Sequence, residues 1–129
     1  MKLTLIALLL AGTSAFASDV PTDTVVLGAL DKVSGRVNTI RGGVGEQLAF
    51  GNLRIVARTC LTHPPEERPE NSAFLEIAQM LQDKKQPPQQ VFSGWMFSSN
   101  PAVSAMDHPV YDVWVLSCES SDKKASSSR

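Results

Sequence analysis

Four short segments in the first half of the chain have the composition or the alternation of β-strands: residues 24–30, 36–40, 44–50 and 53–60. In the last segment Leu53, Ile55 and Ala57 fall on one face, because successive strand side chains point to opposite sides of a sheet. Turns that contain glycine separate the segments, and the pair Gly42–Gly43 is expected to end the second strand. This spacing predicts an antiparallel β-meander.

The second half of the chain predicts two further strands, at residues 91–97 and 110–118. Three prolines within residues 63–71 exclude the interior of a helix or a sheet, so this segment is expected to be a surface loop. Residues 83–90 are polar and predict a second loop or turn.

Residues 72–82 are ambiguous between a helix and a strand. Five of the apolar residues of this segment recur at helical spacing: Ala73, Phe74, Ile77, Ala78 and Leu81. Strand alternation fits the segment only partly. The periodicity favours a helix here, with a strand as the alternative.

Together the segments predict a mainly β fold, a small antiparallel β-sandwich or partly open barrel with one or two short helices. A single domain is expected over residues 24–119. Asn100 and Pro101 have the residue types of a helix start, with room for one turn. Residues 18–23 are expected to form a flexible lead-in, and the serine- and lysine-rich residues 120–129 a disordered tail.

The first 17 residues have the layout of a secretory signal peptide. Lys2 precedes the apolar run Leu3–Ala11, and Ala15–Ala17 supplies small residues where a signal peptidase cuts. An N-terminal membrane anchor is the alternative, but the apolar run falls well short of the ~20 residues that span a bilayer. The sequence therefore predicts an exported, periplasmic protein that is cleaved after Ala17.

The chain contains two cysteines, Cys60 and Cys118, so one intramolecular pairing is available. Exported cysteines meet an oxidising compartment, and a disulfide that closes a loop of this length stabilises a fold by about 4 kcal/mol in the chain-entropy model. The alternative is a metal site with Cys60, His63 and His108 as ligands. Zinc sites of that kind usually contain a second close-spaced pair, and Cys118 has no neighbouring ligand. We therefore predict a disulfide, no metal site and no cofactor.

The charge of the chain restricts its partners. The leader carries Lys2 and no acidic residue, so its removal leaves 11 basic and 13 acidic residues. A weakly acidic surface does not attract phosphates, which argues against a nucleic-acid partner. The sequence has no polybasic stretch or basic amphipathic helix, so stable membrane insertion after cleavage is not expected. An envelope protein or a cell-wall component is the expected kind of partner.

Several motifs together resemble one bacterial family. They are Asp31–Gly35, Phe50-Gly51-x-Leu53, Phe92–Phe97, Asn100-Pro101 and His108–Trp114. The sequence resembles the alphaproteobacterial family catalogued as domain of unknown function 2155, from about Leu30 to Cys118. The resemblance implies a small exported envelope protein without an assigned activity. It makes Cys60 paired with Cys118 the natural arrangement, and it supplies no catalytic residues.

A catalytic set is weakly supported. A serine hydrolase needs a nucleophile, an imidazole base and a carboxylate, and candidates exist in His108, Asp112 and one of Ser93, Ser98 or Ser99. No Gly-x-Ser-x-Gly elbow is present, however. A more ordinary role for His108 and Asp112 is to hydrogen-bond loop backbone beside Pro109. A small hydrolase or metal-dependent enzyme that uses His63, His108 and Asp112 is therefore the alternative function.

Aromatic residues are concentrated in the last two predicted strands. Alternation places Trp95 and Phe97 on one face and Phe92 and Met96 on the other. If one face fills the core, the other is exposed, and an exposed aromatic cluster marks a binding surface. Core packing alone is the favoured interpretation of these rings, because aromatic residues in strands are mostly buried.

The principal functional prediction is a non-catalytic binding or envelope-assembly module. It has no predicted catalytic residue, and the residues of its candidate binding surface are Trp95, Phe97, His108, Tyr111, Asp112 and Trp114.

Overall fold

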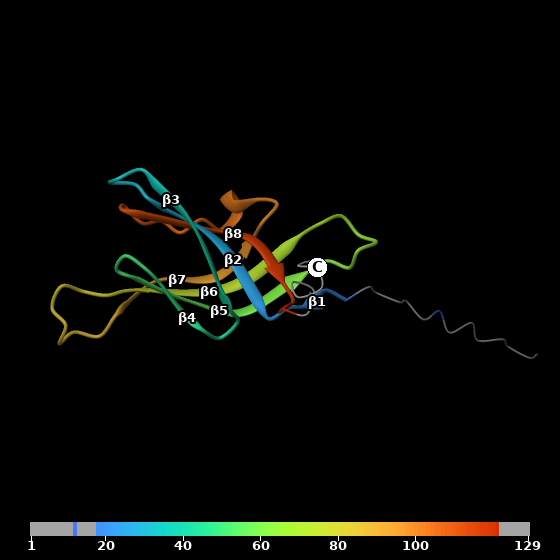
Figure 1. The fold of residues 1–129 in the computed structure, drawn as a ribbon, viewed down its shortest axis with the longest axis horizontal. Coiled ribbons are helices and arrows are strands. Elements are labelled where there is room, and N and C mark those ends of the chain that lie inside the picture. The colour runs from blue at the N-terminus through green and yellow to red at the C-terminus, as the bar shows by residue number, and fades with distance from the viewer. Residues whose placement is uncertain (1–11, 13–17, 122–129) are drawn as a thin grey trace, which may run out of the picture.

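The structure, a computed structural model, describes residue 12 and residues 18–121. Most of the predicted leader and most of the predicted tail therefore lie outside the described residues. Over residues 18–121 the chain forms two antiparallel sheets that pack against each other as a β-sandwich and do not close into a barrel (Figure 1). This confirms the predicted fold class.

The larger sheet, called sheet A, has the strand order β1-β5-β6-β7, and β4 pairs with β5 beside β1. Its strands are β1 (Val20–Pro21), β4 (Gln47–Phe50), β5 (Leu53–Thr62), β6 (Asn71–Gln79) and β7 (Gln89–Phe97). Strands β5, β6 and β7 follow one another in sequence and in space, as the predicted meander requires.

The smaller sheet, called sheet B, has the order β3-β2-β8. Its strands are β2 (Thr24–Asp31), β3 (Arg36–Gly43) and β8 (Tyr111–Glu119). Strand β2 thus pairs on one side with β3, its neighbour in sequence, and on the other side with β8, the last strand of the domain. A 3-10 turn, η1 (Pro101–Ser104), follows β7. It begins where Asn100 and Pro101 predicted a helix, although the Asn100 side chain makes no capping hydrogen bond.

The hydrophobic core lies between the two sheets. Leu27 of β2 and Val115 of β8 are paired across sheet B and are at most 1% exposed. Leu53, Ile55 and Ala57 point into the same core from β5 and are fully buried, as their alternation predicts. Each fully buried aliphatic side chain of the larger kind contributes about 1.5–3 kcal/mol, so this layer is the main source of stability.

A disulfide joins the two sheets. Cys60 lies on β5 in sheet A and Cys118 lies on β8 in sheet B, and their Cα atoms are 5.6 Å apart. Both cysteines are buried, with 1% and 7% exposure. The predicted pairing is confirmed, and Cys60 is bonded to sulfur rather than available as a metal ligand.

Residues 72–82 correct one prediction of the sequence. Most of this segment is strand β6, not a helix. Ala73, Leu75 and Ile77 point into the core, while Phe74 and Ala78 point outward. The outer face of this strand is itself partly apolar, and these outward residues interrupt the period-two pattern and imitate helical spacing.

The glycine pair 42–43 is the second difference from the prediction. Both residues lie inside β3, which continues through Gly43. A Cβ atom on Gly42 would overlap the side chain of Leu48. The glycine is therefore explained by the close approach of β4 and not by a break in the strand.

Both ends of the domain are held by hydrogen bonds. The lead-in contains β1, which pairs with Leu61 and Thr62 of β5. At the other end, the backbone N–H of Ser121 donates to Oδ1 of Asp23 at 2.8 Å. Hydrogen bonds from Ser121 and Thr24 keep the pKa of Asp23 below its usual value. Among the described residues, no helix has the length and apolar character needed to cross a membrane.

Candidate functional site

Three aromatic side chains lie together on the outer side of sheet A. Phe74 of β6 and Trp95 of β7 are cross-strand partners, and their rings meet edge to face at a centroid distance of 5.6 Å and an angle of 76°. Phe97 lies two positions along β7 on the same face and is half-buried. Trp95 is 39% exposed. We call Phe74, Trp95 and Phe97 the aromatic face.

Polar groups border the aromatic face on the same side of the sheet. Arg58, the extra residue of a β-bulge in β5, donates from Nε to Oε2 of Glu76 at 3.0 Å. Ser93 of β7 pairs with Glu76 and is exposed. An apolar centre beside charged and hydroxyl groups has the make-up of a protein-binding surface.

Strand β7 forms an edge of sheet A. Within residues 18–121 it pairs with β6 alone. Its nine residues contain no proline and no charged residue, the two usual devices that keep an edge strand from pairing with another chain. A third device, a β-bulge, is present at Val91, and η1 contacts the same strand. Within residues 18–121 no strand pairs with the outer edge of β7, and the aromatic face lies beside this edge.

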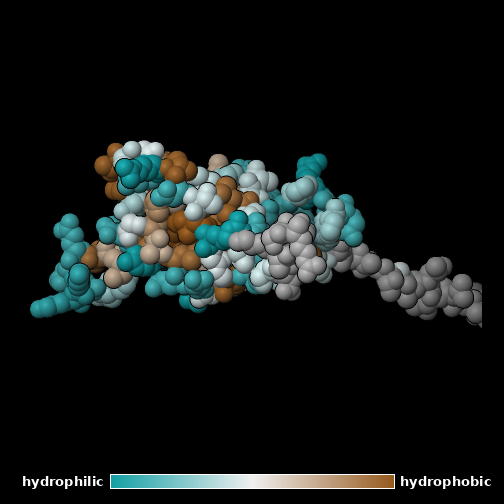
Figure 2. All heavy atoms as spheres, viewed as in Figure 1, coloured by the Kyte–Doolittle hydropathy of each residue, from teal (hydrophilic) through white to brown (hydrophobic). Residues whose placement is uncertain are grey.

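Trp114 and Asp112 lie on the outer side of the other sheet. Trp114 is the cross-strand partner of Gly28, and a Cβ atom on Gly28 would overlap its indole. Asp112 pairs with Leu30. Val37 of β3, the cross-strand partner of Leu30, is 62% exposed. Figure 2 shows brown atoms on the surface at its upper left, the end at which Figure 1 draws the turn between β2 and β3. Trp114 thus packs on a glycine of its own sheet and does not join the aromatic face.

His108 has a structural position in the segment before β8. It is 6% exposed, and its Nδ1 accepts hydrogen bonds from the backbone N–H groups of Val110 and Tyr111 at 3.0 and 3.1 Å. The proton must then be on Nε2, which donates to Oε1 of Gln79 at 3.0 Å. Both ring nitrogens are used, so His108 holds the loop backbone, the ordinary role considered for it above. Tyr111 is also buried, at 9% exposure.

The six predicted surface residues therefore occupy three places. Trp95 and Phe97 share the aromatic face, Asp112 and Trp114 lie on sheet B, and His108 and Tyr111 are buried. The prediction missed Phe74, because the expected helix hid its pairing with Trp95.

The alternative catalytic set is not assembled in the structure. His63 follows the last residue of β5, whereas His108 bonds to Gln79, the partner of the first residue of β5. At about 3.3 Å per strand residue, the length of β5 places the two histidines about 30 Å apart. Ser93 lies on the outer side of sheet A, away from His108.

Ser98 and Ser99 belong to a separate polar cluster around Glu70. Oε1 of Glu70 accepts hydrogen bonds from Ser98 Oγ and from the backbone N–H groups of Asn71 and Ser99, and Oε2 accepts one from Ser99 Oγ. Partial burial raises the pKa of Glu70, but the hydrogen bonds from Ser99, Asn71 and Ser98 outweigh it and hold the pKa below its usual value. The cluster fixes the end of the proline-rich loop to the end of β7.

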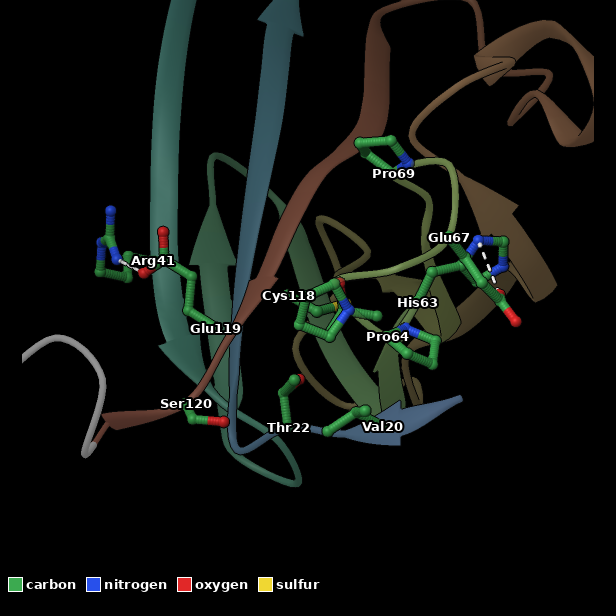
Figure 3. Close-up of a pocket in the computed structure, with 12 residues that line it drawn as sticks. Val20, Thr22, Arg41, His63, Pro64, Glu67, Pro69, Cys118, Glu119 and Ser120 are labelled. Carbon is green, nitrogen blue, oxygen red and sulfur yellow. Dashed lines mark hydrogen bonds and ion pairs between the residues drawn. The ribbon is translucent and has the colours of Figure 1, made fainter. Parts of the chain in front are cut away.

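A surface cavity of about 800 Å³ opens where the proline-rich loop meets the ends of β1 and β8 (Figure 3). Its lining includes Val20, Thr22, Arg41, His63, Pro64 and Glu119. Arg41 and Glu119 form an ion pair across sheet B at its rim. The proline rings make one wall apolar, and His63 with Glu67 forms a polar corner.

Comparisons with known proteins identify a family without a described function. The pattern of the family described as "Uncharacterized protein conserved in bacteria (DUF2155)" matches residues 25–118. An uncharacterised protein of Rickettsia prowazekii (strain Madrid E) is 29% identical over 90 residues, which cover 70% of this chain and 57% of that protein. The chain thus aligns with little more than half the length of this relative. No solved structure matches the chain. The match over most of the chain shows that this protein belongs to the DUF2155 family.

Proposed function

We propose that this protein is a non-catalytic binding module, exported to the cell envelope, that holds a partner protein on its aromatic face and the adjoining edge of β7. The observation that carries the proposal is the position of Trp95. Its ring leans edge-on against Phe74 on the outer side of sheet A and keeps 39% of its surface exposed.

Packing of the hydrophobic core does not explain why aromatic side chains lie on the outer side of β7. The interior side of β7 is occupied by Met96, which is 2% exposed, so the fold buries the other face of this strand. Aromatic side chains that remain on the surface are the residue type that most often anchors a protein partner.

The edge of β7 determines which kind of partner fits best. An added strand gains main-chain hydrogen bonds along the edge and side-chain contacts from alternate positions. Trp95 and Phe97 occupy such alternate positions on β7, and Ser93 extends the row. A protein segment in extended conformation uses the edge and the aromatic face together, whereas a cell-wall glycan uses the aromatic face alone.

Export supports the envelope as the compartment in which this partner is met. The layout of residues 1–17 is that of a cleaved leader, and a disulfide between Cys60 and Cys118 suits an oxidising compartment. The direct measurement is cell fractionation with N-terminal sequencing of the native protein. We expect a periplasmic protein that begins at Ser18. A cytoplasmic chain that retains its leader would contradict this part of the proposal.

Site-specific photo-crosslinking in the native cells tests the binding surface. A photo-reactive amino acid replaces Ser93 on β7 in one variant and Thr39 on the outer side of sheet B in a matched control. We expect a discrete protein adduct from position 93 that disappears when Trp95→Ala is added, and none from position 39. Adducts from position 39 alone, or retention of the purified protein on cell-wall glycan without a protein adduct, would overturn the proposal.

A further inference from the structure

The imidazole of His63 is held in one orientation by the loop that follows it. Its Nδ1 lies 2.8 Å from the backbone oxygen of Arg68. A carbonyl oxygen only accepts hydrogen bonds, so Nδ1 carries a proton and donates it. Histidines that bind metals commonly fix their second nitrogen on a backbone carbonyl in this way, which leaves the other nitrogen to the ion. In His63 that other nitrogen is Nε2.

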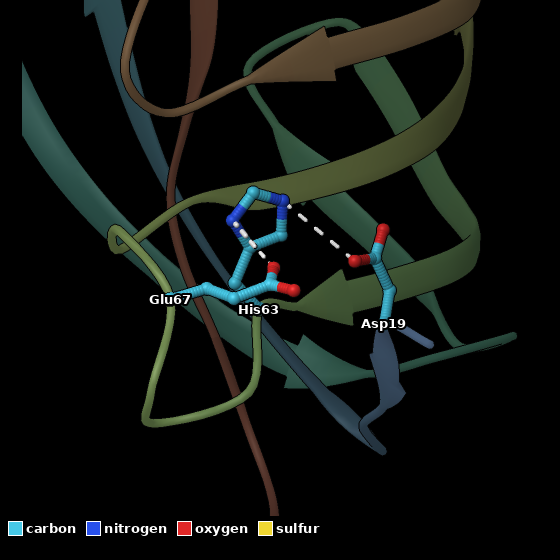
Figure 4. A group of neighbouring side chains, drawn as sticks. All are labelled: Asp19, His63 and Glu67. Atoms are coloured by element: carbon cyan, nitrogen blue, oxygen red, sulfur yellow. Dashed lines mark ion pairs between the residues drawn. The ribbon is translucent and has the colours of Figure 1, made fainter. Parts of the chain in front are cut away.

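Nε2 of His63 faces the carboxylate of Asp19 (Figure 4). Oδ1 of Asp19 is 3.6 Å from Nε2, which is beyond the usual range of a hydrogen bond. In this tautomer both atoms are acceptors, so no hydrogen bond joins them and a cation between them would stabilise the approach. Two ligands at about 2.1 Å from one tetrahedral ion are about 3.4 Å apart, and the observed gap is of that size.

A second carboxylate lies at the same place. Oε2 of Glu67 is 3.8 Å from Nδ1 of His63, on the side of the ring opposite to Asp19. One ligand atom from each of Asp19, His63 and Glu67 can be chosen so that all three lie within 4.8 Å of one another. The Glu67 side chain is 39% exposed and approaches Nδ1, so it must rotate about its own bonds to reach an ion held at Nε2.

We propose that Asp19, His63 and Glu67 bind one divalent transition-metal ion of the zinc class, with water in the remaining position. One imidazole nitrogen with two carboxylate oxygens suits Zn²⁺ better than Ca²⁺ or Mg²⁺, which are bound by oxygen ligands. The two carboxylates also balance the charge of the ion. The site is distinct from the aromatic face and does not depend on the proposed partner.

The ion fastens the start of the domain to the proline-rich loop. Asp19 directly precedes β1, which has only two residue pairs with β5. Glu67 lies at the middle of the loop that borders the cavity. Binding therefore orders the two segments that form one wall of this cavity.

Calorimetric titration of the purified protein, free of any histidine tag and treated with chelator, tests the site with Zn²⁺ at neutral pH. We expect one ion per chain and no saturable binding of Ca²⁺ or Mg²⁺. His63→Gln keeps a donor near the Arg68 oxygen but removes the nitrogen ligand, and it should weaken Zn²⁺ binding at least tenfold. Glu67→Gln should also weaken binding, whereas Glu66→Gln, an exposed neighbour in the same loop, should leave it unchanged.

Two readouts separate this site from other causes. With Co²⁺ in place of Zn²⁺, the visible spectrum should report a nitrogen ligand in the original protein and lose that signature in His63→Gln. Thermal unfolding without metal checks that each variant folds, and if His63→Gln does not fold, Asp19→Asn and Glu67→Gln decide. No saturable Zn²⁺ binding, or binding that is equal in His63→Gln, would overturn the proposal.

Discussion

Asn71 and Cys118 are joined across the two sheets by a hydrogen bond in which the backbone N–H of Cys118 donates to Oδ1 of Asn71 at 3.0 Å. Asn71 begins β6 in sheet A, and Cys118 lies on β8, an edge strand of sheet B. The bond pairs a backbone group that β8 cannot pair within its own sheet. It stands beside the disulfide, so a polar and a covalent connection hold the sheets at the same point.

Asn71→Ala should lower the free energy of unfolding by about 1–3 kcal/mol, because it leaves the partly buried N–H of Cys118 without an acceptor. The measurement is denaturant unfolding of the oxidised protein. Asn100→Ala is the matched control, since the Asn100 side chain is exposed and makes no capping bond, and it should change stability little. Equal effects of the two substitutions would contradict this account of Asn71.

Replacement of both cysteines by serine should cost about 4 kcal/mol, the chain-entropy value for a loop of this length. The loss should appear as a lower midpoint of denaturant unfolding. Because Cys60 and Cys118 are buried, a mild reductant should act on the native protein slowly and on the unfolded protein quickly. Rapid reduction of the native protein without unfolding would show that the bond is more accessible than its burial indicates.

Gly28→Ala should destabilise the protein by about 1–3 kcal/mol, because the new methyl group overlaps the indole of Trp114 and forces it to move. Gly94→Ala is a matched mid-strand control. There the nearest atom to the new Cβ would be Cζ of Phe92 at 3.4 Å, an ordinary contact. The midpoint of thermal unfolding should be clearly lower in Gly28→Ala than in Gly94→Ala. An unchanged midpoint in Gly28→Ala would mean that the Trp114 indole can move away from Gly28 without cost.

Glu70 should make the free energy of unfolding depend on pH in the acidic range. Its pKa is lower in the folded protein than its ordinary value of 4.5, so its contribution is present above that value and is lost as the pH falls through the folded pKa. Denaturant unfolding from neutral pH down to pH 3 should show this loss. Glu70→Gln cannot ionise, and it should flatten that part of the profile. An unchanged acid slope in Glu70→Gln would assign the slope to other carboxylates.

Trp95→Ala should retain the fold, because the ring lies on the outer side of sheet A and the loss of its pairing with Phe74 costs about 0.5–1.5 kcal/mol. Its thermal unfolding should stay cooperative and close to that of the original protein. A variant that fails to fold would place the ring in the core and would remove the basis of the proposed binding surface.

The inner face of the sandwich was readable from the sequence. Leu53, Ile55 and Ala57 alternate as half-buried strands do, and β5 carries them into the core as predicted. Trp95 and Met96 were assigned to opposite faces by the same rule, and the structure agrees. Period-two alternation survives wherever one side of a strand is apolar and the other polar.

The outer face was not readable in the same way. Phe74 and Ala78 put apolar residues on the outer side of β6, and the alternation of this strand then resembles a helix. The periodicity of a single segment shows which of its side chains are apolar. It does not show which of two apolar faces packs against the other sheet. The pairing of Phe74 with Trp95 is set by register between strands, and a single sequence does not contain that register.

The candidate site was predictable only in part for a related reason. His108 and Trp95 are close in sequence, but one ring holds loop backbone and the other lies on the outside of a sheet. Side chains that bear similar chemistry are sorted by the sheet and face on which they fall. Asp19 and His63 show the reverse case, since 43 intervening residues separate side chains that β1 and β5 bring together.

The disulfide between Cys60 and Cys118 can form only after the last strand, β8, has been synthesised. Cys118 follows Cys60 with a sequence separation of 58, so its thiol is the second of the pair to leave the ribosome and, for an exported chain, the second to cross the membrane. Every strand up to β7 is already outside before oxidation is able to tie β8 to β5. The covalent bond therefore forms late, when β1 to β7 are already available to pair.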